Sequence, residues 1–270
     1  MIFKKKKILT IDELNAYRVA YGSPLKRKEL FLSLLIPFGV AFFYTFILFY
    51  NLWLPLIAGV LAMIYSYAYI VPQQVKRVYE NNAFREKNNF VNNMTQILTN
   101  NEKTVLQALK TVADRANGEF KEDLLKLQAK IVDGNNQDIQ DSFQWLASKY
   151  ESDVIFSLYV EQLTTLVIEG RHNIETLKDI KTYHNEIKKR QEKFFIQKQQ
   201  KEWEFKFMCK VGLLLIGTIT ISFGFSQFIE VYAHKPIGWV ASIIYLLMIA
   251  KTYNTFLNRM GDDSIMEVQV

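Results

Sequence analysis

Four long apolar stretches constrain the fold of this 270-residue chain more than any other feature. About 20 apolar residues in a helix are enough to cross the roughly 30 Å hydrocarbon core of a bilayer. Gly and Pro are sparse and alternation of β-branched residues is absent, so these stretches are predicted to be transmembrane helices. They come as two pairs: Leu30–Tyr50 with Leu52–Val71, and Val211–Ile229 with Pro236–Leu257.

The positions of the charges predict the topology. Lys26, Arg27 and Lys28 precede the first pair, Lys76 and Arg77 follow it, and the turn within it has no Lys or Arg. Basic flanks stay in the cytoplasm, so both termini are expected there, in a multi-pass membrane protein. The net charge of +6 then needs no nucleic-acid partner. Lys251 lies in the fourth stretch and is expected to snorkel, because a central lysine costs about 2.5–3.5 kcal/mol.

The segment between the two pairs carries an internal repeat with a spacing of 34 residues. Each copy is predicted to be helix, tight turn, helix, and because one hairpin cannot bury its own apolar face, three hairpins should stack. The fold class is therefore all-α, with four transmembrane helices and a cytoplasmic six-helix domain of three stacked helical hairpins. The anchors are Leu109, Phe143 and Leu177; Val112, Leu146 and Ile180; Phe90, Leu124 and Leu158; and Leu98, Val132 and Leu166.

A short helix is expected before the first apolar stretch. Thr10 and Glu13 form a capping box, and Gly22 suits the left-handed position after the helix. One helical pattern continues from Asn173 to about Lys210 without Pro or Gly. The expected organisation is a basic N-terminal segment (1–29), a membrane hairpin (30–72), a cytoplasmic six-helix domain with its stalk (73–210), a second membrane hairpin (211–257) and a cytoplasmic tail (258–270).

No set of residues predicts catalysis, a cofactor or a metal. The three histidines, His172, His184 and His234, are expected to be solvated or to cap helices. The cores of the apolar stretches contain no ionisable residue, whereas ion-coupled transporters place one on the transport pathway. The remaining candidates are residues in or near the three turns, which could contact a cytoplasmic partner. They are Asn100, Asn101, Lys103, Gly134, Asp138, Gly170 and Arg171.

Two turns carry a motif that resembles a known family. One runs Ile131-Val132-Asp133-Gly134 and continues to Ser142–Ala147; the other runs Leu166–Gly170 and continues to Ile174–Leu177. Together with the layout, they resemble the F-domain family, the inner-membrane platform proteins of type II secretion and type IV pilus machines. The single-domain form of tight-adherence (Tad) pilus systems is the most similar. The resemblance covers about Phe84 to Phe228, and Asn100-Asn101 stands where the family usually has a glycine.

The resemblance implies a non-enzymatic platform in the membrane, without cofactors. Its implied partners are a cytoplasmic hexameric secretion ATPase, pilin-like subunits and membrane lipid. Because the chain has one copy of the domain, the resemblance also implies a homo-oligomer or a paralogous second platform protein. Asn173 to Ile229 would transmit movement between the domain and the membrane.

Two other functions remain open from the sequence. The 34-residue period is also that of tetratricopeptide repeats, so a membrane-anchored helical-repeat adaptor is possible, although the Trp, Gly and Pro signature of those repeats is missing. A small channel or transporter lined by Ser and Thr is the other alternative, and it conflicts with the lack of ionisable residues in the apolar cores.

Overall fold

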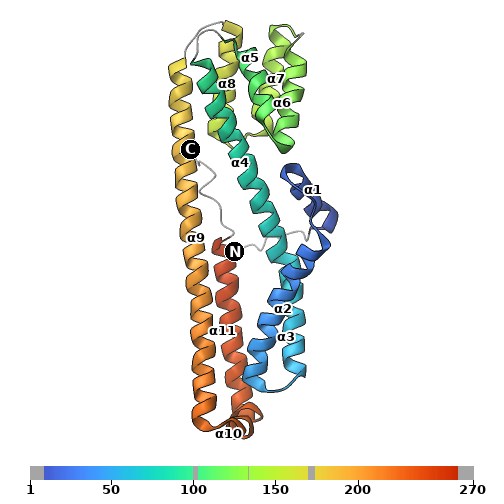
Figure 1. Ribbon diagram of the computed structural model, residues 1–270, viewed down its shortest axis with the longest axis vertical. Coiled ribbons are helices and arrows are strands. Elements are labelled where there is room, and N and C mark those ends of the chain that lie inside the picture. The colour runs from blue at the N-terminus through green and yellow to red at the C-terminus, as the bar shows by residue number, and fades with distance from the viewer. Residues whose placement is uncertain (1–8, 100–102, 133, 170–173, 261–270) are drawn as a thin grey trace, which may run out of the picture. The chain divides into compact units, whose positions relative to one another are not determined.

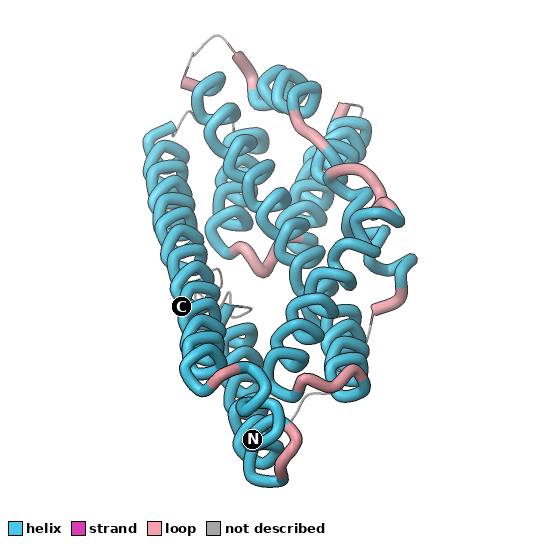
Figure 2. Tube along the Cα trace, turned by 60° about the horizontal axis from the view of Figure 1, so that its bottom comes forward, coloured by secondary structure: helices cyan, strands magenta, loops and turns pink. Residues whose placement is uncertain are grey.

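A computed structural model of the chain describes residues 9–99, 103–132, 134–169 and 174–260. Every regular element in these ranges is a helix (Figure 1 and Figure 2). The all-α prediction is therefore confirmed. Four helices are long and apolar enough to cross a membrane, judged by length and composition: Arg27–Phe49, Trp53–Leu98, Ile174–Phe223 and Pro236–Asn258.

The chain divides into two compact units. Of the described residues, those in 9–15, 25–76 and 196–260 form unit 1, and those in 16–24 and 77–195 form unit 2. The second half of the expected stalk, residues 196–210, thus belongs to the unit with the apolar helices.

Unit 2 is a bundle of antiparallel helices. They are the later part of α4 (Val71–Leu98), α5 (Val105–Arg115), α6 (Gly118–Ile131), α7 (Asn136–Lys149), α8 (Val154–Glu169) and the first part of α9 (Ile174–Phe223). Successive helices run in opposite directions, so the ends of α4, α6 and α8 lie at the same end of the bundle as the starts of α5, α7 and α9 (Figure 1).

All six helices contribute to one apolar core, and most of the predicted repeat anchors lie in it. Leu109, Phe143 and Leu177 are fully buried, as expected. Two anchors were wrong, because Leu158 is 42% exposed and Val132 is 65% exposed. The register explains the first error: Phe120 and Phe156 are both buried and lie 156 − 120 = 36 positions apart. The connection between α7 and α8 is two residues longer than that between α5 and α6, so the spacing in this part is 36.

The three repeats enclose this core together. Phe90, in the first repeat, has its ring centroid 5.9 Å from that of Phe156 and 6.2 Å from that of Tyr159, both in the third. Thr95 Oγ1 also lies 2.8 Å from the Tyr159 hydroxyl. In an open solenoid each repeat contacts only its neighbours, so unit 2 is a closed bundle instead.

The short helix α1 (Ile11–Tyr21) has the predicted cap. Glu13 N donates to Thr10 Oγ1 at 3.3 Å, and Thr10 N donates to Glu13 Oε2 at 2.8 Å. The expectation for Gly22 was wrong, since the described glycines with positive φ are Gly118 and Gly224. Gly118 begins α6 with φ 62°, and a Cβ there would lie 2.2 Å from the Ala20 carbonyl oxygen, so α1 packs at a position that requires glycine.

Unit 1 contains two apolar hairpins. The first joins α2 (Arg27–Phe49) to α3 (Trp53–Tyr65), which continues through a π-helical turn, η1 (Ser66–Ile70), into α4 without a loop. In the second, α9 ends at Phe223 rather than at the expected Ile229, because Gly224 has φ 80° and breaks the helix. Short α10 (Phe225–Phe228) and the π-helical η2 (Ile229–Ala233) then lead into α11 (Pro236–Met260).

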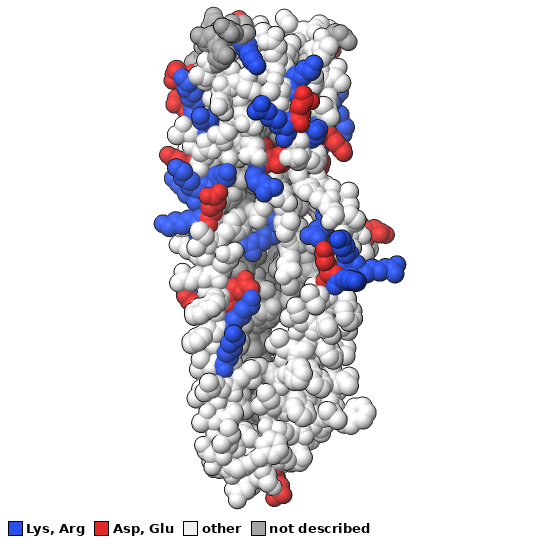
Figure 3. Space-filling model, in the orientation of Figure 1, with Lys and Arg blue, Asp and Glu red and all other residues white. Residues whose placement is uncertain are grey.

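A polar contact brings α2, α9 and α11 of unit 1 together at one level. The hydroxyls of Tyr44 and Tyr245 lie 2.7 Å apart, and Gly212 leaves the space that both occupy, because a Cβ there would lie 2.7 Å from the Tyr245 hydroxyl. The outer faces of α2 and α9 in this unit carry exposed apolar side chains, such as Phe31, Phe43 and Leu214. The space-filling view shows a broad surface almost free of charge in this part of the chain (Figure 3).

Candidate functional site

A buried polar cluster lies in unit 2, at the end of the bundle opposite the three predicted turns. It forms where α4 and α9 pass the connections between α5 and α6 and between α7 and α8. Buried polar groups must find partners within the protein, so each one fixes its neighbours. The cluster consists of two parts, one around Asp153 and one around Asp123.

Asp153 is the centre of the first part. Its Oδ2 atom accepts from Lys87 Nζ at 2.6 Å, and its Oδ1 atom accepts from Phe156 N at 3.2 Å, which caps the start of α8. The side chains of Lys87 and Asp153 are only 9% and 13% exposed. Burial alone would raise the pKa of Asp153, but the neighbouring His184 and the Lys87 charge outweigh it and hold this pKa well below its usual range.

The Lys87 ammonium is also enclosed by aromatic rings. Its Nζ atom lies 5.9 Å from the ring centroid of Phe84, 5.6 Å from that of Tyr150 and 5.7 Å from that of Phe156. These distances are within the range of cation–π attraction, which is stronger where water is excluded. One cation therefore joins α4 to the end of α7 and the start of α8.

His184 is fully buried on α9, so the expectation that it is solvated or a helix cap was wrong. Its Nδ1 atom lies 2.9 Å from Asn88 Nδ2, which also donates to Asn185 Oδ1 at 2.9 Å. Because Asn88 supplies the proton of this bond, Nδ1 is the acceptor and the ring proton is on Nε2. Nε2 lies 3.7 Å from Asp153 Oδ2, and the ring stacks on Phe84 with centroids 5.0 Å apart.

The second part of the cluster is built around Asp123, which is 1% exposed. Its Oδ2 atom accepts from Lys149 Nζ at 2.5 Å and from the Tyr150 hydroxyl at 2.7 Å. Lys149 also donates to Glu119 Oε1 at 2.8 Å, and Glu119 Oε2 accepts from the Tyr79 hydroxyl at 2.8 Å. This ion-pair network joins α4, α6 and α7.

The pKa values in this network shift as the pairing requires. Burial opposes the charged forms, but hydrogen bonds from Lys149 and Tyr79 lower the pKa of Glu119, and bonds to Asp123 and Glu119 raise the pKa of Lys149. Burial, with the hydrogen bond to Asp123, raises the pKa of Tyr150 far above its usual value. At neutral pH, Glu119 and Lys149 are therefore charged and Tyr150 is neutral.

The structure describes three of the seven predicted partner-contact residues. Lys103 is exposed just before α5, whereas Asp138 accepts from Asn135 N at 3.0 Å and so closes the capping box that begins α7. A Cβ on Gly134 would lie 2.8 Å from the Lys130 carbonyl oxygen, so the turn explains this glycine. All three lie at the same end of unit 2. Asn100, Asn101, Gly170 and Arg171 are outside the described residues, as is His172.

The buried cluster was missed from the sequence, although a signal for it exists. Leu177, Ile180 and His184 follow the spacing i, i+3, i+7, which puts His184 on the buried face of α9. In the same way Lys87 precedes Phe90 and Val91 by three and four positions on α4. The acids at the start of α6 pair with Lys149 of α7, and this pairing appears only in the tertiary structure.

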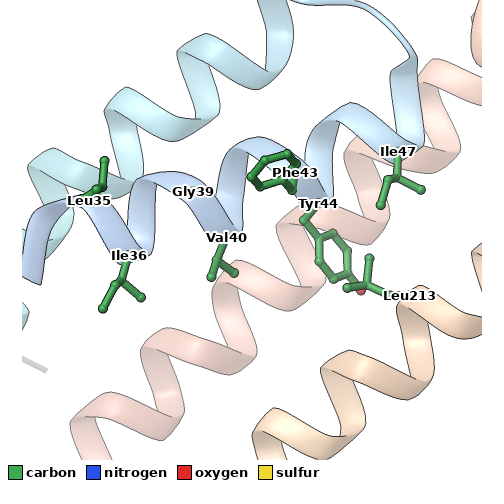
Figure 4. Close-up of a pocket in the computed structure, with 8 residues that line it drawn as sticks. All are labelled: Leu35, Ile36, Gly39, Val40, Phe43, Tyr44, Ile47 and Leu213. Carbon is green, nitrogen blue, oxygen red and sulfur yellow. The ribbon is translucent and has the colours of Figure 1, made fainter. Parts of the chain in front are cut away.

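No group of three or more His, Cys, Asp or Glu side chains suited to a metal ion occurs within the described ranges. An apolar groove of about 430 Å³ lies on α2 in unit 1, lined by side chains from Leu35 to Ile47 and by Leu213 of α9 (Figure 4). Its one polar side chain is Tyr44, whose hydroxyl is already bonded to Tyr245. The groove therefore offers little to orient a polar ligand.

Comparison with known proteins gives one close relationship. The chain is 41% identical over 266 residues to the uncharacterized protein pXO2-23 of Bacillus anthracis, and the match covers 98% of this chain and 96% of that protein. No protein-family model matches the chain, and no solved structure does. Identity at this level over nearly the full length of both proteins shows common descent, so the chain belongs to the family of this Bacillus anthracis protein.

Proposed function

We propose that the chain is an inner-membrane platform protein of a pilus-assembly or protein-secretion machine. In this role it couples a cytoplasmic hexameric ATPase to the extraction and assembly of pilin-like subunits, as a homo-oligomer or with a paralogous second platform protein. Unit 2 is then the cytoplasmic domain, built of three helical hairpins, and both termini are cytoplasmic. The proposal rests on the layout of the chain, not on any relative of known activity.

The observation that carries the proposal is the continuity of two helices. The helix that begins with α3 continues through η1 into α4 without a loop, and α9 contains both a bundle helix and an apolar stretch. A helix resists bending far more than a loop does, so α9, which is continuous from Ile174 to Phe223, is suited to transmit movement between a cytoplasmic domain and the membrane. The path through α3 and α4 can bend at η1 and at Pro72. The buried cluster supports this role because it ties α4 and α9 to the start of α8.

The adaptor function is weaker than this proposal. A solenoid adaptor binds a peptide on the extended concave face of an open stack. The contacts of Phe90 with Phe156 and Tyr159 join the first and third repeats around one core, which leaves no such face between them.

The test begins with affinity purification of the full-length chain from its native membranes and mass spectrometry of the bound proteins. We expect a hexameric secretion-type ATPase and a pilin-like protein. Recovery of the chain with neither of them, under conditions that preserve other membrane complexes, would contradict the proposal.

A second experiment tests the transmitting helix. Gln191 is buried, so a proline there would disturb the bundle itself; Lys193 is an exposed position on the same helix. A proline inside a helix removes a hydrogen bond and bends it. We expect Lys193→Pro to abolish pilus assembly or secretion while the chain stays in the membrane, and Lys193→Ala to leave both intact. Normal assembly with Lys193→Pro would exclude α9 as the transmitting element.

A third experiment tests the predicted contact surface at the end of unit 2 where α5 and α7 begin. Lys103→Glu reverses an exposed charge there, and Lys110→Glu makes the same change on the exposed side of α5. We expect Lys103→Glu to reduce recovery of the ATPase and Lys110→Glu to leave it unchanged. Equal recovery with both variants would place the contact elsewhere.

A further inference from the structure

The two apolar hairpins of unit 1 differ in length. On α2 the uncharged stretch from Leu30 to Phe49 spans about 30 Å at 1.5 Å per residue, which matches a hydrocarbon core. On α9 the stretch from Val211 to Phe223 spans about 20 Å, and on α11 the stretch from Pro236 to Ala250 about 22 Å, by the same rise. The uncharged stretches of the second hairpin are therefore about 8–10 Å shorter than that of α2, although its helices continue beyond them.

The contact between Tyr44, Tyr245 and Gly212 gives these helices a common level. We measure from this level along each helix, away from the turns of the two hairpins. On α9, Lys210 is two residues from Gly212, or about 3 Å. On α11, Lys251 is six residues from Tyr245, or about 9 Å. In the same direction on α2 the first charged residue, Glu29, lies fifteen residues away, or about 22 Å. Both lysines thus lie beside the apolar part of α2.

A second set of contacts confirms this register. Ser66 Oγ donates to the Ser33 carbonyl oxygen at 3.0 Å, and the neighbouring Tyr65 hydroxyl donates to Asn254 Oδ1 at 2.8 Å. Asn254 of α11 is therefore close to the level of Ser33 on α2. Lys251 precedes Asn254 by three residues, so it lies about 4–5 Å further into the apolar zone, alongside the first turn of α2 after Ser33.

Neither lysine has a partner that would neutralise it there. Lys210 and Lys251 are both exposed, and among the described residues no carboxylate lies within 4.0 Å of either. By contrast, two other lysines of α9 have partners: Lys201 pairs with Glu204 at 2.7 Å, and Lys206 pairs with Glu202 at 2.6 Å. A lysine at membrane depth needs either an anion or a route to the surface.

We propose that the face formed by α9 and α11 meets a locally thinned bilayer, in which Lys210 and Lys251 bind the phosphate groups of anionic phospholipids. This inference rests on the proposed insertion of unit 1 in a membrane. A bilayer adjusts to a short apolar stretch by thinning, and flanking lysines extend towards the headgroups. Anionic headgroups attract basic side chains at the surface, which favours a phospholipid as the ligand.

A protein partner explains the arrangement less well. Around the two lysines the outer faces of α9 and α11 carry bulky apolar side chains that are more than half exposed, such as Phe207, Met208 and Met248. Such residues are ordinary lipid-facing ones. Thinning on this face also fits the proposed function, because a shorter apolar path eases removal of a helix from the membrane.

The single cysteine of the chain reports the thickness of the bilayer at this face. Cys209 precedes Lys210 and is partly exposed. The full-length chain is reconstituted in dioleoyl vesicles of phosphatidylglycerol and phosphatidylcholine, and labelled with an uncharged polyethylene-glycol maleimide that does not cross membranes. The control is Cys209→Ser with Val40→Cys, because Val40 is exposed on α2 within its apolar stretch.

In vesicles, we expect the labelling rate of Cys209 to be within about threefold of its rate in detergent, because the thinned bilayer leaves it near the surface. We expect the cysteine of Val40→Cys to be labelled at least about tenfold more slowly in vesicles than in detergent, because hydrocarbon excludes the reagent. The double variant Lys210→Leu, Lys251→Leu lengthens both apolar stretches. It should lower the rate at which Cys209 is labelled about tenfold. The Cys209 rate should fall about threefold in pure phosphatidylcholine, because fewer anionic headgroups hold the lysines at the surface. Added inorganic phosphate should not restore it, which separates a lipid headgroup from free phosphate.

Two results would overturn the proposal. If Cys209 is labelled as slowly as the cysteine of Val40→Cys in vesicles that contain phosphatidylglycerol, the bilayer is not thinned at this face. If the Lys210→Leu, Lys251→Leu variant labels at the original rate, the lysines do not hold the boundary there. Rapid labelling of Val40→Cys in vesicles would instead contradict membrane insertion itself, and with it the localisation in the proposed function.

Discussion

Lys87 Nζ lies 2.6 Å from Asp153 Oδ2, in a position where both side chains are almost completely buried. The pair joins the middle of α4 to the residue that caps the start of α8, and His184 brings α9 to the same carboxylate. A buried ion pair contributes little net stability compared with apolar residues, but loss of one partner leaves an uncompensated charge. The pair therefore fixes the positions of three helices more than it strengthens the bundle.

Removal of the lysine charge should strongly destabilise unit 2. We expect Lys87→Met to lower the free energy of unfolding by about 3–5 kcal/mol, because Asp153 is left buried without its cation. The measurement is a denaturant titration of the full-length chain in detergent, followed by circular dichroism. Lys110→Met, at an exposed position on α5, should change the free energy by less than about 0.5 kcal/mol.

The double variant Lys87→Met with Asp153→Asn separates charge from packing. Because neither partner is then ionised, we expect it to be more stable than Lys87→Met alone. If the double variant instead lost as much free energy of unfolding as the two single variants lose together, the two charges would not be coupled.

The stability of unit 2 should depend on pH at both ends of the range. The pKa of Asp153 is lowered in the folded chain, so its contribution is present above its unfolded pKa of about 3.9 and is lost as the pH falls towards the folded pKa. Tyr150 has a raised pKa, so its contribution is present below its unfolded pKa of about 10 and is lost as the pH rises above it. We expect a plateau of stability between about pH 5 and pH 9.

Variants test which group causes the loss of stability at low pH (the acid limb) and at high pH (the alkaline limb). Stability is measured as the midpoint of denaturant unfolding at each pH. Asp153→Asn should flatten the acid limb, and Tyr150→Phe should flatten the alkaline limb, although each variant starts from a lower plateau. An unchanged alkaline limb in Tyr150→Phe would assign that limb to other groups, of which Tyr79 is the next candidate because its pKa is also raised.

Glycine at position 118 should be required for the packing of α1. Gly118 has φ 62°, a conformation that costs another residue about 1–2 kcal/mol, and the Ala20 carbonyl oxygen lies 2.2 Å from the position of a Cβ. We expect Gly118→Ala to lower the midpoint of thermal unfolding and to increase hydrogen exchange in α1. Gly217→Ala is the matched control, because nothing lies within 4 Å of a Cβ there; equal effects of the two changes would show that the contact with α1 is unimportant.

The sequence predicted the helical class, the apolar helices and most of the core, because these depend on composition and period. Leu109 and Phe143 are buried as predicted, since they follow the helical spacing within elements of similar length. Leu158 was misplaced because two additional residues in the connection before α8 shift its register. The length of a connection has no periodic signal, so only the structure reveals this shift.

The buried cluster was harder to predict, because its partners are distant in sequence. Lys87 and Asp153 are 66 positions apart. The helical spacing places Lys87 on the buried face of α4, but no local pattern shows which acid it pairs with. The end of α9 at Phe223 was also missed. Gly224 lies in an apolar run that continues to Ile229, so hydropathy gave no sign of the break.

The tyrosine pair should set the contact between α2, α9 and α11. A hydrogen bond between membrane helices contributes about 0.6 kcal/mol on average and at most about 1.7 kcal/mol, so Tyr44→Phe alone should have a small effect. Gly212→Ala should cost more, because its Cβ would lie 2.7 Å from the Tyr245 hydroxyl and 3.1 Å from that of Tyr44. Removal of both hydroxyls opens space for this Cβ, so Gly212→Ala should be tolerated better in a Tyr44→Phe, Tyr245→Phe background. The measurement is a double-mutant cycle on the unfolding of the purified chain in detergent, and additive effects would mean that Gly212 and the two hydroxyls do not meet.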